Sequence, residues 1–130
     1  MKTINIRTSK RGEMVDITGE IQKRVNESGL QSGLVCIFVP HTTAGVSINE
    51  NADPDVARDV LFAFDRLVPN SGFAHAEGNS DAHTKAQITG LSLTVIIKDG
   101  RLMLGTWQGI YFCEYDGPRH RRVYVKFIAD

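Results

Sequence analysis

Apolar and polar residues alternate along several short segments of the chain, which is the pattern of half-buried β-strands. KTINIRT near the N-terminus and EMVDI after Gly12 predict two strands that can pair as a hairpin. GLVCIFVP is a continuous apolar run of strand length and predicts a central strand. Past Leu91, turns at Asp99-Gly100 and Asp116-Gly117-Pro118 separate the strand-like segments LSLTVIIK, RLMLG, QGIYFCEY and RVYVKFIA.

The middle of the chain has the spacing of helices. Asp53-Pro54 is a typical helix start, because the aspartate can cap the first turn and proline fits its first position. This helix is predicted to run to about Leu67. Its apolar residues recur every three or four positions and predict a buried stripe of Val56, Val60, Leu61, Phe64 and Leu67.

Two shorter helices are expected on either side of it. Ile21 and Val25 share one face of a segment that Thr18 can cap and Gly29 can end. Asp81 can cap a second short helix through AHTKAQIT, which Gly90 closes.

Strands at both ends of the chain and helices grouped between them indicate an α+β fold. The 130 residues are enough for one core but marginal for two, so residues 1–130 are expected to form a single small domain. We predict a mostly antiparallel β-sheet with two or three helices packed on it.

Charge excludes some classes of partner. Fifteen basic residues balance fifteen acidic ones, so no overall field favours nucleic acid or a membrane surface. No apolar run approaches the roughly 18 residues of a membrane span, and the N-terminus lacks a signal region, so a cytoplasmic location is expected. The short basic run of residues 119–122 is either a solvated turn or a place that receives a phosphate.

The first candidate cluster is PHTTAGVSINE, directly after the predicted central strand. His41, Thr42 and Thr43 stand at its start, and Asn49 and Glu50 stand at the far end of a short strand. Side chains at a strand end are held rigidly and can face a crevice. The alternative is a turn in which the threonines bond to local backbone.

The second cluster is the loop FAHAEGNSDAH, with His75 and His83 on either side of Gly78 and with Glu77 and Asp81 between them. Imidazole nitrogens bind zinc-class divalent metals, and carboxylates orient the rings or complete the shell. A polar surface loop that ends in a helix cap explains the same residues.

The third cluster joins GTWQG to DGPRHRR. Trp107 and Gln108 lie between two glycines, where a planar ligand can approach the backbone, although Trp107 can equally be a core residue. Arg119 follows a Gly-Pro turn and can clamp an anion. His120 is less favoured as a metal ligand, because its arginine neighbours repel a cation.

Three segments in order, HTTAGVSINENADPDVARD, HAEGNSDAHTKAQITG and GRLMLGTWQGIYFCEYDGPR, resemble the YjbQ-like proteins, which are labelled secondary thiamine-phosphate synthases. The resemblance implies a small α+β homotrimer with sites near subunit boundaries. It also implies that His41, His75 and His83 are the metal or active-site histidines. The residues implied to accompany them are Asn49, Glu50, Glu77 and Asp81.

The implied reaction joins an aminopyrimidine methyl diphosphate to a thiazole phosphate and releases pyrophosphate. A divalent metal, Zn or Mg, or basic groups such as Lys85 and Arg119 would then stabilise the leaving diphosphate. Glu50 would hydrogen-bond to the aminopyrimidine. Two alternatives stay open: a zinc-type hydrolase with Glu50 or Glu77 as general base, and a non-catalytic trimer that binds a small phosphorylated or heterocyclic ligand or a metal.

Overall fold

The computed structural model describes residues 1–130, which form eight strands and three helices. The strands are β1 (Lys2–Arg7), β2 (Glu13–Asp16), β3 (Ser32–Phe38), β4 (Ala44–Glu50), β5 (Ser92–Lys98), β6 (Arg101–Leu102), β7 (Gln108–Glu114) and β8 (His120–Ala129). The helices are α1 (Thr18–Ser28), α2 (Pro54–Leu67) and α3 (Ser80–Thr89). None of them is long and apolar enough to cross a membrane.

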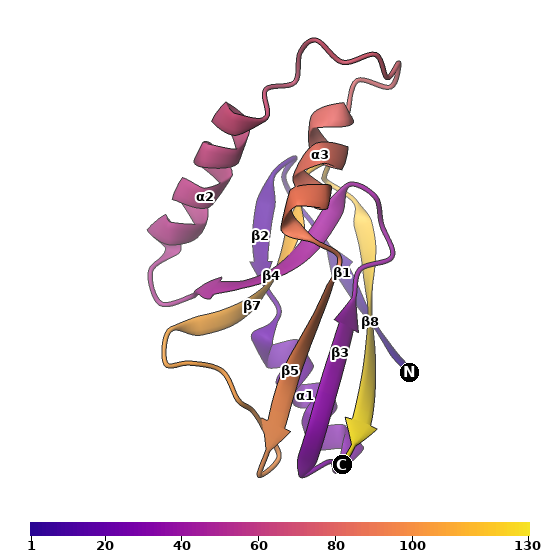
Figure 1. Ribbon diagram of the computed structural model, residues 1–130, viewed down its shortest axis with the longest axis vertical. Coiled ribbons are helices and arrows are strands. Elements are labelled where there is room, and N and C mark those ends of the chain that lie inside the picture. The colour runs from indigo at the N-terminus through magenta and orange to yellow at the C-terminus, as the bar shows by residue number, and fades with distance from the viewer.

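The strands form two antiparallel sheets (Figure 1). The larger sheet has the order β1-β8-β3-β5-β6, and the smaller has the order β2-β7-β4. The α+β class is therefore confirmed, and β3, the predicted central strand, lies in the middle of the larger sheet.

The predicted N-terminal hairpin is wrong. β1 pairs with β8 in the larger sheet, whereas β2 pairs with β7 in the smaller one. The alternating pattern shows which face of a strand is buried, but it does not show which strand lies beside it. The segment between β1 and β2 instead crosses from one sheet to the other, and Thr8 N–H bonds to the Arg119 carbonyl on the way.

The core lies between the sheets. The buried faces of β1, β3, β5 and β8 pack against Ile21 and Val25 of α1 and against Val46, Ile110 and Phe112 of the smaller sheet. A second apolar cluster covers the opposite face of β7, where Ala82 and Ala86 of α3 meet alternate residues of that strand. Both faces of β7 are thus covered, and α3 is fixed against it.

Helix α2 corrects one prediction. Its start at Asp53-Pro54 and its end at Leu67 are confirmed, but no residue of the predicted stripe is fully buried. Leu61 and Phe64 pack against the second cluster, whereas Leu67 remains 74% exposed. Figure 1 shows α2 to one side of the molecule, so only part of its apolar face meets the rest of the chain.

The caps of the other helices also differ from expectation. α1 has Ile17 at its N-cap position, and the Asp16 carboxylate accepts from Thr18 N–H at 3.0 Å. α3 has Asn79 at its N-cap, so Asp81 lies inside the first turn. The predicted ends at Gly29 and Gly90 are confirmed.

Candidate functional site

A polar cavity of about 500 Å³ opens where β3 ends and α3 begins. Apart from Pro40, every side chain that lines it is polar. The lining residues are Pro40, His41, Thr42, Thr43, His75, Glu77, Asn79, His83, Asp116, Arg119 and Arg121. We call this space the histidine cavity, because it brings together three of the four histidines of the chain.

His41 follows β3, and the backbone of β8 holds its ring. Its Nε2 accepts a hydrogen bond from the Arg122 backbone N–H at 3.0 Å. Burial lowers the pKa of His41 below the ordinary 6.5, and the guanidinium groups of Arg121 and Arg122 lower it further. The ring is therefore neutral at pH 7, and with Nε2 accepting, Nδ1 carries the proton and can donate it in a hydrogen bond.

His75 and His83 meet across the loop that precedes α3. Their ring centroids are 5.5 Å apart, and the rings are nearly perpendicular. Gly78 lies between them with a φ of 78°, a left-handed conformation that favours glycine and lets the loop turn back. Glu77 adds a carboxylate 3.9 Å from His75 Nε2.

The histidine cavity does not fit a three-histidine metal centre as arranged. No group of three or more His, Cys, Asp or Glu side chains is placed to hold one ion. The Nε2 lone pair of His41 is also engaged by the Arg122 N–H, and its Nδ1 carries a proton. Metal binding would require His41 to turn or to lose that proton.

The cavity floor contains a buried ion pair that the sequence analysis missed. Arg121 Nε donates to Glu114 Oε1 at 2.8 Å, and its Nη2 donates to Glu114 Oε2 and, at 2.9 Å, to Thr43 Oγ1. Burial tends to raise the pKa of Glu114, but hydrogen bonds from Arg121 and Thr8 outweigh it and hold the pKa below its ordinary value. Glu114 ends a strand that is buried on both faces, and Arg121 occupies a buried position of the alternating strand β8. The signal in the sequence was a charged residue at the end of the apolar run QGIYFCEY.

Asn79 and Asp116 form the wall beside the N-terminus of α3 and were also missed as site residues. Asn79 Nδ2 donates to Asp116 Oδ2 at 2.9 Å, and Arg119 Nη2 donates to the same oxygen at 3.0 Å. Burial acts to raise the pKa of Asp116, but these two bonds hold it below its ordinary value. The Asn79 Oδ1 atom is buried without a hydrogen-bond partner.

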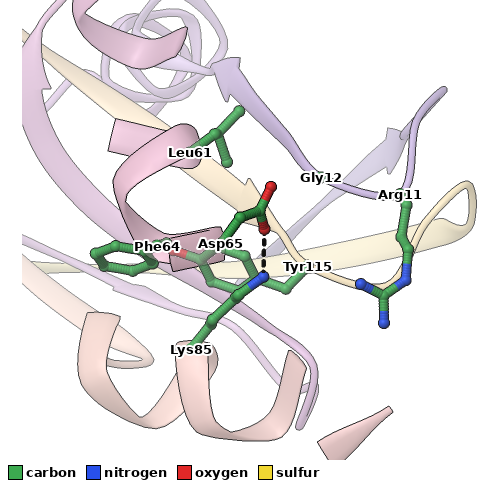
Figure 2. A pocket seen from close by; sticks show the side chains of 7 residues that line it. All are labelled: Arg11, Gly12, Leu61, Phe64, Asp65, Lys85 and Tyr115. Atoms are coloured by element: carbon green, nitrogen blue, oxygen red, sulfur yellow. Dashed lines mark hydrogen bonds and ion pairs between the residues drawn. The ribbon is translucent and has the colours of Figure 1, made fainter. Parts of the chain in front are cut away.

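Lys85 and Asp81 lie outside the histidine cavity, on the other side of α3. Figure 2 shows Lys85 of α3 reaching Asp65 of α2, and both residues line a small pocket of about 160 Å³. Lys85 Nζ is 2.6 Å from Asp65 Oδ1 and 3.5 Å from Asp81 Oδ2. Asp81 is buried and accepts two bonds from Arg11, at 2.9 and 3.0 Å. Lys85 thus links α3 to α2, and Asp81 links α3 to the segment between β1 and β2.

Asn49, Glu50, Trp107 and Gln108 lie at the opposite end of the β4–β7 pair. Glu50 pairs with Gln108 in the register, and Trp107, 63% exposed, precedes β7. Because β4 rises about 3.4 Å per residue, its far end lies roughly 20 Å from the histidine cavity. The candidate residues of one chain therefore form three groups: the histidine cavity, the Lys85–Asp81 pair, and this far end of the β4–β7 pair.

Residues 2–130 match the protein family described as UPF0047 protein YjbQ-like. The chain belongs to this family. A UPF0047 protein of Methanocaldococcus jannaschii is 56% identical over 126 residues, covering 96% of this YjbQ-like chain and 91% of that protein. The UPF0047 protein YugU of Bacillus subtilis is 53% identical over 131 residues, covering 99% of each.

Solved structures agree with this membership. A crystal structure of an uncharacterised conserved YjbQ/UPF0047 protein from Clostridium acetobutylicum superposes with a TM-score of 0.96 at 52% identity, covering 98% of this YjbQ-like chain and 100% of that chain. A conserved hypothetical protein from Thermus thermophilus gives a TM-score of 0.92 at 38% identity, with the same coverage. Family and fold are thus shown, without a specific activity.

Proposed function

We propose that the protein is an enzyme that acts on a small phosphorylated molecule bound in the histidine cavity. The observation that carries this proposal is the convergence of His41, His75 and His83 in a space with polar walls and a buried arginine in its floor. Formation of thiamine phosphate is the reaction that the family resemblance implies, and we adopt it as the first candidate.

The anion-binding role falls to Arg119, Arg121 and the first turn of α3. The N-terminus of a helix offers free backbone N–H groups and favours negative charge. The two arginines are each paired with a carboxylate, so the cavity has donors but little net charge. A ligand that brings both acceptors and donors fits it.

The proton-transfer role falls to the histidines. His75 and His83 can exchange protons with the ligand, which is the usual role of imidazole in catalysis. His41 is fixed as a hydrogen-bond donor, since its Nε2 is engaged. No step is assigned to a metal, and metal binding by His75 and His83 is a separate proposal that elemental analysis of tag-free protein tests.

Hydrolysis of the same phosphorylated ligand is the second candidate. Apart from Pro40, the cavity wall has no apolar side chain that would exclude water. Transfer of a reactive pyrimidine cation to a thiazole requires such exclusion, whereas hydrolysis uses the water. The transferase would be favoured if a second subunit covered the cavity, as in the homotrimer that the family resemblance implies.

One assay separates the candidates. The purified protein receives the aminopyrimidine methyl diphosphate with and without the thiazole phosphate, and thiamine phosphate and pyrophosphate are measured. A transferase forms both only when both substrates are present, whereas a hydrolase releases pyrophosphate from the first alone.

His83→Ala should lower kcat by about 10²- to 10⁴-fold, while Lys98→Ala, at the far edge of the larger sheet, should not. Unchanged turnover in His83→Ala would refute the proposal, and ligand binding without any turnover would leave a binding protein.

A further inference from the structure

A groove of about 440 Å³ lies along the β1–β8 pair. Its lining is Asn5, Ile6, Arg7, His120, Arg121 and Arg122, with no carboxylate among them. It is separate from the histidine cavity, and Arg121 is the one residue that lines both. We call it the β1–β8 groove.

The strand register gathers basic side chains in this groove. Arg7 pairs with His120, and Asn5 pairs with Arg122. All four are exposed on one face, while Ile4, Ile6, Arg121 and Val123 are buried on the other. Directly opposed residues of an antiparallel pair have Cβ atoms about 4.5–5.5 Å apart, so the four side chains surround a common space.

Arg7 and Arg122 differ from most other arginines of the chain, because neither forms an ion pair. Arg11, Arg24, Arg58, Arg119 and Arg121 each pair with a carboxylate. Like charges on neighbouring strands destabilise a sheet, and here no acidic side chain relieves them. An oxyanion in the groove would supply the missing negative charge.

Arg122 is also held in place. Its guanidinium carbon lies 5.9 Å from the centroid of the Tyr124 ring, and its backbone N–H is fixed by His41. An arginine that is ordered before binding loses less entropy when it clamps an anion.

We propose that the β1–β8 groove is a second oxyanion site, in which Arg7, His120 and Arg122 bind a phosphate or diphosphate group. The group is either a separate anion or a second phosphoryl group of the ligand in the histidine cavity. In both cases the chemistry of recognition is the same, since guanidinium groups bind phosphate oxygens in bidentate fashion. A separate anion would bind independently of the reaction proposed above, whereas a second phosphoryl group of the same ligand rests on that proposed function.

The test is a titration of the ¹⁵N-labelled protein with inorganic pyrophosphate and with inorganic phosphate, followed by amide shifts. Amides of Asn5 to Arg7 report on the groove, and amides of Ser80 to His83 report on the histidine cavity. Both sets should move in the wild type. Equal dissociation constants for the two sets indicate one ligand that spans both sites, and different constants indicate two anions.

Arg7→Ala/Arg122→Ala should weaken the β1 response by roughly tenfold or more, because two charge-assisted hydrogen bonds are lost. The α3 response should persist, since the bond to His41 comes from the Arg122 backbone. The matched control is Lys98→Ala/Arg101→Ala, which removes two exposed, directly paired basic residues from the opposite edge of the same sheet.

His83→Ala should alter the α3 response and leave binding at Asn5 to Arg7 in place for a separate anion. The proposal would be overturned if the β1 amide shifts of the wild type did not move when either anion is added. It would also be overturned by equal weakening of the β1 response by the double variant and by its matched control, which would indicate general charge screening.

Discussion

At the scale of single residues, His41 shows how a backbone contact fixes the chemistry of a side chain. Its Nε2 accepts from Arg122 N–H, and two guanidinium groups lie nearby. Both features favour the neutral ring. In a metal site or a general base, by contrast, one nitrogen must present a free lone pair to its partner.

We predict that His41 titrates below 6.5 and keeps its proton on Nδ1, because burial and Arg121 and Arg122 all oppose a positive charge on the ring. Ring ¹³C and ¹⁵N shifts measured from pH 4 to 8 check both points. In Arg122→Ala the midpoint should rise toward 6.5 while the backbone bond remains. A wild-type midpoint above 6.5 would contradict this account.

The Glu114–Arg121 ion pair is a second feature at the scale of single residues, and it makes the stability of the folded state depend on pH. The pKa of Glu114 is depressed in the folded state, so the pair stabilises the fold above the ordinary 4.5. That contribution is lost as the pH falls through the lower, folded-state pKa.

Arg121→Met should destabilise the protein by about 3–5 kcal/mol at pH 7, because it leaves a buried carboxylate without its partner. The difference from wild type should shrink at pH 4, where the unpaired Glu114 takes up a proton. Urea unfolding at both pH values measures this. Arg122→Met, an exposed neighbour, should change stability by less than about 0.5 kcal/mol. An equal loss at both pH values would show that packing, not charge, accounts for the effect.

Sequence patterns located the histidine cluster better than they located its supports. His41, His75 and His83 were predicted together, and the structure places them in one cavity. Glu114 and Arg121 were missed, because a charge at a core position reads as an interruption of a strand. The ion pair becomes evident only in the folded structure, where β7 and β8 bring the two charges together across the core.

At the scale of elements, α2 is the least anchored helix. It has no fully buried residue, and it is held by Leu61 and Phe64, by the Asp65–Lys85 ion pair, and by stacking of Phe64 on Tyr115 at 5.9 Å. The sequence gives the period of a helix correctly, but the period shows only which residues share a face. Whether a partner covers that face depends on tertiary packing, and so the buried stripe was wrongly predicted.

Phe64→Ala should loosen α2 while the sheets stay intact. The loss should be about 1–2 kcal/mol, less than for a fully buried ring, because Phe64 is only half-buried. Hydrogen exchange of residues 54–67 should accelerate roughly tenfold, since 1.4 kcal/mol is one factor of ten, with no change in β3 or β8. Phe62→Ala, on the exposed face, is the control. Faster exchange throughout the sheets would show that α2 is part of the core.

At the scale of the whole molecule, two of the three groups of candidate residues lie at opposite ends of the β4–β7 pair. The larger sheet also exposes Phe38, Ile96 and Ile128, each at least 46% accessible. Leu34 pairs with Ile96 on one side and Ile128 on the other, so Ile96, Leu34 and Ile128 form an apolar row on the outer face. A homotrimer, as the family resemblance implies, would cover such a face and could place the Glu50 end of one subunit beside the histidine cavity of the next.

Subunit mixing tests this arrangement. Glu50→Ala and His83→Ala should each be nearly inactive in thiamine phosphate formation. Equal amounts unfolded and refolded together should regain about one quarter of wild-type activity, because a random trimer places an intact His83 beside an intact Glu50 of its neighbour at one boundary in four. Sedimentation of the wild type should give about three times the 14.4 kDa chain mass. A trimer without recovered activity would place the complete site within one chain, and a monomer would remove the basis for a shared site.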